Sequence, residues 1–344
     1  MRDGGASDGG GTAGAPTWSR TRDRAEGAPV TVAAGRPWWH HVRVPAFVLA
    51  ALLLVEVGVR AVEERLSIDV RHINRMDEIV TALVAAPGPS VLFVGNSLTR
   101  EGVDLELMRA GLAANRAGEW NVAAVYPDDT AVLDWLYLYD RYVVENDAVP
   151  DAVVVGFGIW HLEDRPISRA QAYRLGRHFA SDRMLGQLLG TDLTTLTDRM
   201  NVLLARYSAA FANRERVSRR VLALLPGYEE SAPRVNDLLR EPEEAQASAP
   251  TYGRLERFVR EVVGSGAELV LAAMPTRAGY DLDPELVRVA EAAGARVLDL
   301  RDVPGLTAAM FADPLHLDDG GAELFSRHAA QELAPLLSPA AAVR

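Results

Sequence analysis

The sequence predicts a doubly wound α/β domain, in which helices flank both faces of a parallel sheet. Four apolar runs have the length of strands that are buried on both faces. Helical patterns lie between these runs, and strands that alternate with helices form parallel sheets with right-handed crossovers. The expected strands are 90–94, 152–157, 268–273 and 296–300, and the expected helices are 104–115, 130–145, 252–265 and 284–293.

Composition excludes several classes of function. The chain has 344 residues and a net charge of -11, which argues against a protein that holds nucleic acid through phosphate contacts. It has no cysteine, so a disulfide, a thiolate nucleophile and a cysteine-ligated metal are all excluded. The carboxylate pairs at 128–129 and 318–319 do not have the spacing of metal ligands. They are typical of turns and of the first residues of helices. We therefore expect no cofactor and no metal.

The N-terminal region predicts a tail and a membrane anchor. Residues 1–36 lack apolar periodicity and are expected to be disordered. Residues 37–64 are expected to form the anchor, because the apolar run 44–62 has about the length that crosses a bilayer and Trp38 and Trp39 suit a headgroup belt. Arg36 and Arg43 favour a cytoplasmic N-terminus, so the folded domain is expected outside a cell membrane that it spans once. A cleaved signal peptide and a soluble helix are the alternatives.

The rest of the chain divides into a linker and one large domain. Residues 65–89 are expected to form a helical linker that ends at Pro87-Gly88-Pro89. The α/β domain then occupies 90–344 and contains an Arg-rich helical insertion at about 165–250. This insertion is either a helical subdomain packed beside the sheet or a lid over the site.

Ser97 is the first candidate for chemistry. It lies just beyond the carboxyl end of the first expected strand, where open α/β sheets bind ligands. The Gly95-Asn96-Ser97 turn exposes the hydroxyl, and nearby backbone N–H groups would face a developing oxyanion. The alternative is an ordinary turn in which Ser97 or Asn96 is the N-cap of the following helix.

Asp313 and His316 supply the partner that a serine nucleophile needs. They lie three residues apart in one loop near the C-terminus, before a helical segment. In this spacing the carboxylate can accept the imidazole N–H, fix the tautomer and leave the other ring nitrogen for a serine hydroxyl. His316 is thus a candidate general base for Ser97.

These two blocks resemble those of the SGNH/GDSL hydrolase family. In that family a Gly-Asp-Ser turn after the first strand carries the nucleophile, and an Asp-x-x-His pair near the end completes the triad. Residues 91–99 and 313–316 match the two blocks in order, and the resemblance covers about 90–333 apart from the insertion. It implies an SGNH or flavodoxin-like fold, with Ser97 as nucleophile, His316 as general base and Asp313 as its orienting residue.

The sequence departs from the family pattern around the oxyanion. Asn96 replaces the family's Asp before the nucleophile, and the segment 120–126 lacks the family's Gly. The third block, 156–164, lacks the family's Asn. The expected oxyanion or substrate-binding residues are therefore Asn96, Ala123, Ala124, Gly158 and His161. His161 is equally well explained as a loop residue packed beside Trp160.

Two classes of function follow from these residues. One is a serine esterase or O-acyltransferase that acts on an acylated cell-envelope polysaccharide or glycolipid, with a membrane protein as acyl donor if it transfers. The other is a protein of the same fold that binds glycan or organises an envelope complex without catalysis. A soluble lipase-like enzyme would require residues 44–62 to belong to a protein core.

Overall fold

The computed structural model describes residues 39–115, 119–225, 227–228 and 249–337. It divides into two units, 1–50 and 51–344. The predicted disordered tail, 1–36, lies outside the described residues. In the first unit, the described residues belong to α1 (Trp39–Leu66), which continues into the second unit. Its segment Val42–Leu66 is long and apolar enough to cross a membrane.

The second unit contains a five-stranded parallel sheet with the order β2-β1-β3-β4-β5, which confirms the predicted fold class. The four expected strands are present and a fifth, β2, was not predicted. Because the chain leaves β1 toward β2 and then returns to the other side at β3, the strand order reverses at β1. The strands are β1 (Ser90–Val94), β2 (Asn121–Val125), β3 (Ala152–Phe157), β4 (Glu268–Ala273) and β5 (Arg296–Asp299).

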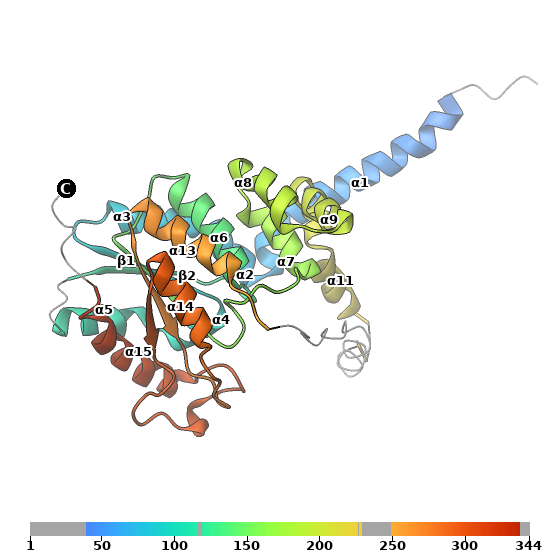
Figure 1. Cartoon of the computed structure of the whole chain (residues 1–344). Helices are drawn as coiled ribbons and strands as arrows, with labels where there is room; N and C mark the ends of the chain where they lie inside the picture. The colour runs from blue at the N-terminus through green and yellow to red at the C-terminus, as the bar shows by residue number, and fades with distance from the viewer. Residues whose placement is uncertain (1–38, 116–118, 226, 229–248, 338–344) are drawn as a thin grey trace, which may run out of the picture. The chain divides into compact units, whose positions relative to one another are not determined.

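Helices cover both faces of the sheet (Figure 1). Alternate side chains of the strands point to opposite faces. Leu92 and Val153 pack with the helices of one face, and Val91 and Val154 with those of the other. The first face is covered by α3 (Met76–Ala85), α6 (Val132–Tyr139), α13 (Gly253–Ser265) and α14 (Pro284–Ala293), and the second by α4 (Ser97–Gly102), α5 (Leu105–Ala114) and α15 (Asp319–Leu333).

The insertion between β3 and β4 is helical, as expected. Leu175, Phe179 and Val202 belong to the same core as the buried face of α6, so the insertion packs as a subdomain on that side of the sheet. Its helices are α7 (Arg169–Arg174), α8 (Asp182–Gln187), α9 (Leu196–Tyr207), α10 (Ala209–Ala212) and α11 (Arg214–Leu222), with π-helical turns at Leu175–Phe179 and Leu188–Asp192. Outside the insertion, a π-helical turn follows α6 at Asp140–Val144 and a 3-10 turn precedes α15 at Ala308–Met310.

The segment predicted to be a linker, 65–89, contributes to the hydrophobic core. It forms α2 (Ile68–Asn74) and α3, and its apolar side chains include Ile73 and Met76, which are fully buried. Ile68, at the start of α2, is instead 78% exposed. Residues 65–89 therefore pack as part of the folded domain.

This packing gives a matched test on one helix. We expect Ile73→Ala to lower the free energy of unfolding by about 2–5 kcal/mol, because it leaves a cavity in the core. Ile68→Ala should change it by less than about 0.5 kcal/mol, because the side chain is exposed. Urea unfolding of the full chain in detergent micelles measures both. A similar, small effect of the two substitutions would contradict the core position of α2.

Candidate active site

Ser97 is placed by a tight turn between β1 and α4. β1 ends at Val94 and Ser97 is the first residue of α4. At Gly95 a Cβ atom would collide with the Thr99 side chain, so this close approach of turn and helix requires glycine. Ser97 is partly exposed, whereas its neighbours Asn96 and Leu98 are buried. The turn therefore leaves one hydroxyl accessible at the carboxyl end of β1.

The structure brings Ser97, His316 and Asp313 into one chain of hydrogen bonds. The Ser97 Oγ lies 2.8 Å from His316 Nε2, and His316 Nδ1 lies 2.7 Å from Asp313 Oδ2. With Nδ1–H donating to the carboxylate, Nε2 is left to accept the serine proton. His316 is 24% exposed and Asp313 49%, so the group faces solvent.

Asp313 is also fixed by its own backbone. Its Oδ1 accepts hydrogen bonds from the N–H groups of Leu315, at 2.7 Å, and His316, at 2.8 Å. The hydrogen bond from His316, followed by these backbone bonds, lowers the pKa of Asp313 to about 2. The carboxylate consequently stays ionised at neutral pH, where it can stabilise a protonated His316.

The loop that carries His316 is anchored on both sides. An antiparallel bridge joins Phe311 to Leu317, and Ala312 N–H donates to His316 O at 2.9 Å. Leu317 is buried. Arg277 N–H, in the loop after β4, donates to Pro314 O at 3.1 Å. These contacts hold the imidazole in place before α15 begins.

Asn96 has a different position from the one expected. It is 1% exposed, and its Oδ1 accepts from Leu98 N–H at 3.0 Å as the N-cap of α4. Its Nδ2 donates to Thr130 O at 3.0 Å. Both polar atoms are therefore engaged within the protein, and Asn96 is a capping residue instead of a substrate-binding one.

Ala123 and Ala124 do not lie at the site. Both are inside β2, where they pair in register with Leu92 and Phe93, two residues and one residue before the last residue of β1. The expectation failed because β2 was not recognised as a strand. The segment that follows β2 at the carboxyl edge of the sheet begins at Tyr126.

The loop after β2 is attached to the Gly95-Asn96-Ser97 turn by buried polar contacts. Trp135 Nε1 donates to Gly95 O at 3.2 Å and lies 3.0 Å from Thr130 Oγ1. Thr130 Oγ1 lies 2.7 Å from Pro127 O and 3.1 Å from Gly95 O. Thr130 and Trp135 are completely buried. Trp135 lies within the expected helix 130–145, and its hydrogen bonds depend on how separate loops pack, which the sequence pattern does not show.

The helical insertion supports the same loop through Arg174. Its guanidinium contacts the carboxylate of Asp129 at 3.1 Å and also the Asp129 backbone oxygen. Arg174 lies 3.6 Å from Asp134, which is fully buried and accepts from Ala131 N–H and the Gln171 side chain. Asp129 has φ 56°, in the left-handed region, and the Arg174 contacts hold it there.

The loop after β3 contains the other two expected residues. Gly158 N–H donates to His161 Nδ1 at 3.1 Å, so this N–H is engaged and is not free for an oxyanion. The neutral His161 ring then carries its proton on Nε2, which has no partner among the described residues. Trp160 lies beside the ring, with centroids 4.6 Å apart. His161 can thus still donate from Nε2 while it packs against Trp160.

Two non-glycine residues with positive φ flank the nucleophile turn. Asp129 follows β2 and Ile159, with φ 47°, follows β3, and these are the two strands that neighbour β1. A positive φ is strained for a β-branched residue such as Ile159. Such strain costs about 1–3 kcal/mol and clusters at functional sites.

Two further observations limit the chemistry. Among the residues that the structure describes, no group of three or more His, Asp or Glu side chains is arranged to hold a metal ion. Ser97 is the first residue of α4, so its N–H has no carbonyl partner one turn earlier within that helix. The arrangement can therefore activate a hydroxyl and offer the N–H of Ser97 to an oxyanion without a metal ligand set.

Comparison with known proteins gives structural similarity only. No family model matches the sequence, and no curated protein matches it. A lipase/acylhydrolase from Enterococcus faecalis is 18% identical, with a TM-score of 0.37, and the match covers 73% of this chain and 98% of that one. The acetylxylan esterase Axe2 from Geobacillus stearothermophilus is 15% identical, with a TM-score of 0.37 and coverage of 73% and 96%. Function is therefore argued from the site itself.

The state of His161 predicts a pH dependence of stability. Burial lowers the pKa of His161 to about 4, whereas in an unfolded chain it is about 6.5. Between pH 6.5 and pH 4, the unfolded chain binds a proton at this histidine and the folded chain does not. The free energy of unfolding therefore keeps its full value above about pH 6.5 and decreases as the pH falls toward 4. The loss from this residue amounts to about 3 kcal/mol.

The variant that isolates this effect is His161→Gln. Glutamine keeps an acceptor for Gly158 N–H but does not titrate, so its free energy of unfolding should fall less on acidification. Urea unfolding of both proteins at about pH 7 and about pH 4.5 measures the difference. Equal losses in the two proteins would contradict a buried, neutral His161.

Proposed function

We propose that this protein is a serine-dependent esterase or O-acyltransferase that forms an acyl-enzyme on Ser97. One observation carries the proposal: the hydrogen bonds that join Ser97 Oγ, His316 and Asp313 at the carboxyl edge of a parallel sheet. An accessible serine, a base within hydrogen-bond reach and a carboxylate that orients the base are the parts required for acyl transfer. The SGNH resemblance of the two sequence blocks supports the same assignment.

The proposed reaction has two steps. Ser97 Oγ attacks the acyl carbonyl as His316 Nε2 takes its proton, and Asp313 stabilises the resulting imidazolium. The C–O bond to the alcohol then breaks, and His316 returns the proton to the leaving alkoxide. In the second step His316 removes a proton from water or from an acceptor hydroxyl, whose oxygen attacks the acyl carbon. The bond between that carbon and Ser97 Oγ then breaks, and Oγ takes the proton back from His316. Water gives hydrolysis, and a sugar hydroxyl gives transfer.

The oxyanion would be stabilised by fewer donors than the resembled family uses. Ser97 N–H is the first donor, and His161 Nε2–H is proposed as the second. Gly158 occupies the region of the expected Asn, and its own N–H is engaged by His161. Because one oxyanion donor is worth about 10²- to 10³-fold in rate, we expect modest turnover.

The proposed substrate is an acylated cell-envelope polysaccharide or glycolipid. This rests on the apolar helix Val42–Leu66, which would anchor the domain beside such molecules with the domain outside the membrane. If the reaction is transfer, an acyl-donor membrane protein is the proposed partner.

A second candidate is a glycan-binding or scaffolding protein without catalysis. The engaged N–H of Gly158 and the absence of an Asn in that loop favour it, because both reduce oxyanion stabilisation. The intact hydrogen bonds of Ser97 and His316 oppose it, because a non-catalytic protein has no need of them.

A fluorophosphonate probe separates these two candidates. We expect the full chain in detergent micelles to react covalently with the probe at Ser97, because His316 removes the hydroxyl proton. Ser97→Ala should abolish labelling, and His316→Ala should slow it by about 10²- to 10⁴-fold. Labelling is measured by intact-protein mass spectrometry.

Ser218→Ala is the matched control. Ser218 is an exposed serine on α11, so its loss should leave the rate and extent of labelling unchanged. If the folded wild-type protein remains unlabelled, the acyl-enzyme proposal fails and the binding-protein candidate is favoured.

A further inference from the structure

The C-terminal part of α1 is bound to the helical insertion. Glu56 accepts hydrogen bonds from Ser208 Oγ at 2.7 Å, Ala209 N–H at 2.8 Å and Ala210 N–H at 3.0 Å, so it caps the N-terminus of α10. One turn later, Arg60 donates to the backbone oxygen of Tyr207 at 3.0 Å. These contacts fix the C-terminal end of α9 beside residues 56–60 of α1.

In the next turns of α1, one side of the helix is buried against protein. Glu63 is 7% exposed and accepts from Arg177 at 2.8 Å and from Asn213 at 2.9 Å. Val59 is 8% exposed. From Glu56 onward, one side of α1 is therefore attached to the folded domain, whereas Val57 and Val62 remain 63% and 37% exposed and the apolar segment continues to Leu66.

This division leaves only a short apolar helix for a bilayer. From Trp39 to Val55, α1 is about 25 Å long at 1.5 Å per residue. The hydrocarbon core of a bilayer is about 30 Å thick. A helix that is too short for the bilayer draws its flanking residues toward the lipid. The surface of the domain beside Glu56 is therefore expected to meet the membrane.

That surface carries an exposed apolar stripe on α9. Leu196, Met200, Leu204 and Tyr207 are 74%, 47%, 43% and 70% exposed. Their spacing of three to four residues places them on one face of the helix, while Val202 on the opposite side is buried. The stripe ends at Tyr207, next to Arg60 of α1.

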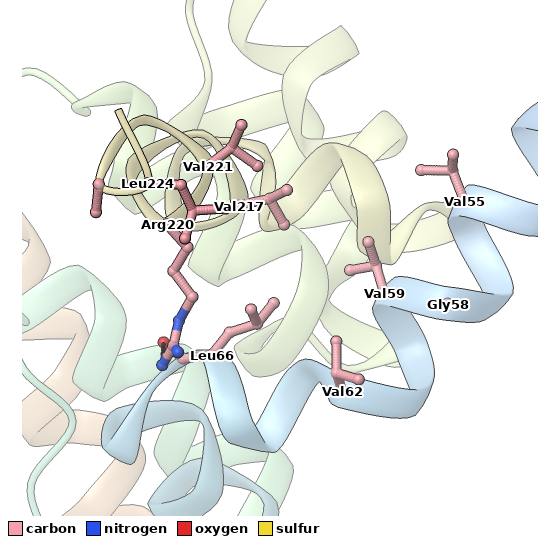
Figure 2. A pocket seen from close by; sticks show the side chains of 10 residues that line it. Val55, Gly58, Val59, Val62, Leu66, Val217, Arg220, Val221 and Leu224 are labelled. Atoms are coloured by element: carbon pink, nitrogen blue, oxygen red, sulfur yellow. Dashed lines mark hydrogen bonds between the residues drawn. The ribbon is translucent and has the colours of Figure 1, made fainter. Parts of the chain in front are cut away.

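A second apolar surface borders α1 at α11. Val221 is 57% exposed and Leu224, just after α11, is 82% exposed. Figure 2 shows these side chains across an open groove from Val55 and Val62 of α1. The groove has a volume of about 610 Å³ and its lining is almost entirely apolar, apart from Arg220.

The charge of the helical part of the insertion suits lipid headgroups. Residues 165–228 contain eleven arginines and four acidic residues, whereas residues 229–250 add two arginines and six acidic residues. Positive charge is thus concentrated in the segment that also carries the exposed apolar side chains. Arginine near anionic lipid contributes about 1 kcal/mol per residue to membrane attraction.

We infer that the helical insertion is seated in the surface of the bilayer that holds α1. The contact is made by Leu196, Met200, Leu204, Tyr207, Val221 and Leu224, which we call the apolar rim. The rim lies at the boundary of headgroups and acyl chains, where an amphipathic, Arg-rich surface binds. The inference rests on the proposed anchor, but it is independent of the chemistry at Ser97.

The absence of cysteine makes this inference directly testable. Single spin labels are placed on the full chain at Met200→Cys, Leu204→Cys and Val221→Cys, and the proteins are reconstituted in vesicles of phosphatidylcholine and phosphatidylglycerol in equal parts. Collision rates with oxygen, which partitions into lipid, and with a water-soluble nickel chelate are compared. Leu52→Cys, on the exposed apolar part of α1, is the lipid reference, and Val263→Cys, at a partly exposed position on α13, is the water reference.

We expect the ratio of oxygen collisions to nickel-chelate collisions at the three rim labels to resemble the ratio at Leu52→Cys. This ratio should be several-fold higher than the ratio at Val263→Cys. The inference would be overturned if the collision ratios at the rim labels matched the ratio at Val263→Cys while the ratio at Leu52→Cys showed that this label lies in lipid. A water-exposed Leu52→Cys would also overturn it, because the anchor itself would then be absent. Fluorophosphonate labelling of the same variants reports separately on Ser97, so the loss of one proposal is distinguishable from the loss of the other.

Discussion

The hydrogen bond between Ser97 and His316 is the interaction on which the proposed chemistry depends. It joins two residues 219 positions apart, at the first and last loops of the α/β domain. The parallel sheet makes this possible, because the carboxyl ends of its strands meet at one edge. Asn96 then fixes the serine turn, and the Arg277 contact to Pro314 fixes the histidine loop. The reactive atoms are thus held by backbone and buried contacts while their side chains stay open to solvent.

The insertion is connected to the site as well as to α1. Arg174 on α7 holds the loop of Asp129, which in turn is bound to the nucleophile turn through Thr130. On its other side, the insertion binds α1, where Arg177 contacts Glu63. A continuous set of packed helices therefore links α1 to the loop beside Ser97. If α1 is the proposed membrane anchor, this arrangement holds Ser97 at a defined place relative to it.

The sequence predicted the elements with strong local patterns and missed those that depend on tertiary contacts. The expected strands at 90–94, 152–157 and 268–273 have the observed bounds, because each is a continuous apolar run. β2 was missed because it is a short edge strand whose alanines carry little strand propensity, and the positions of Ala123 and Ala124 were wrong as a result. The proximity of Ser97 and His316 was predictable from two spaced blocks. The capping role of Asn96 and the support from Arg174 were not, because they depend on how separate loops pack.

The most direct test of the central claim is to trap the acyl-enzyme. The full chain is incubated briefly with p-nitrophenyl acetate and quenched in acid, and its peptides are examined by mass spectrometry. The chain has neither lysine nor cysteine, so few other side chains compete for the acetyl group. The proposed mechanism predicts one acetyl group on Ser97, with release of p-nitrophenolate in an initial burst. A folded protein that carries no acetyl group on Ser97, or carries it only elsewhere, would contradict a nucleophilic role for this serine.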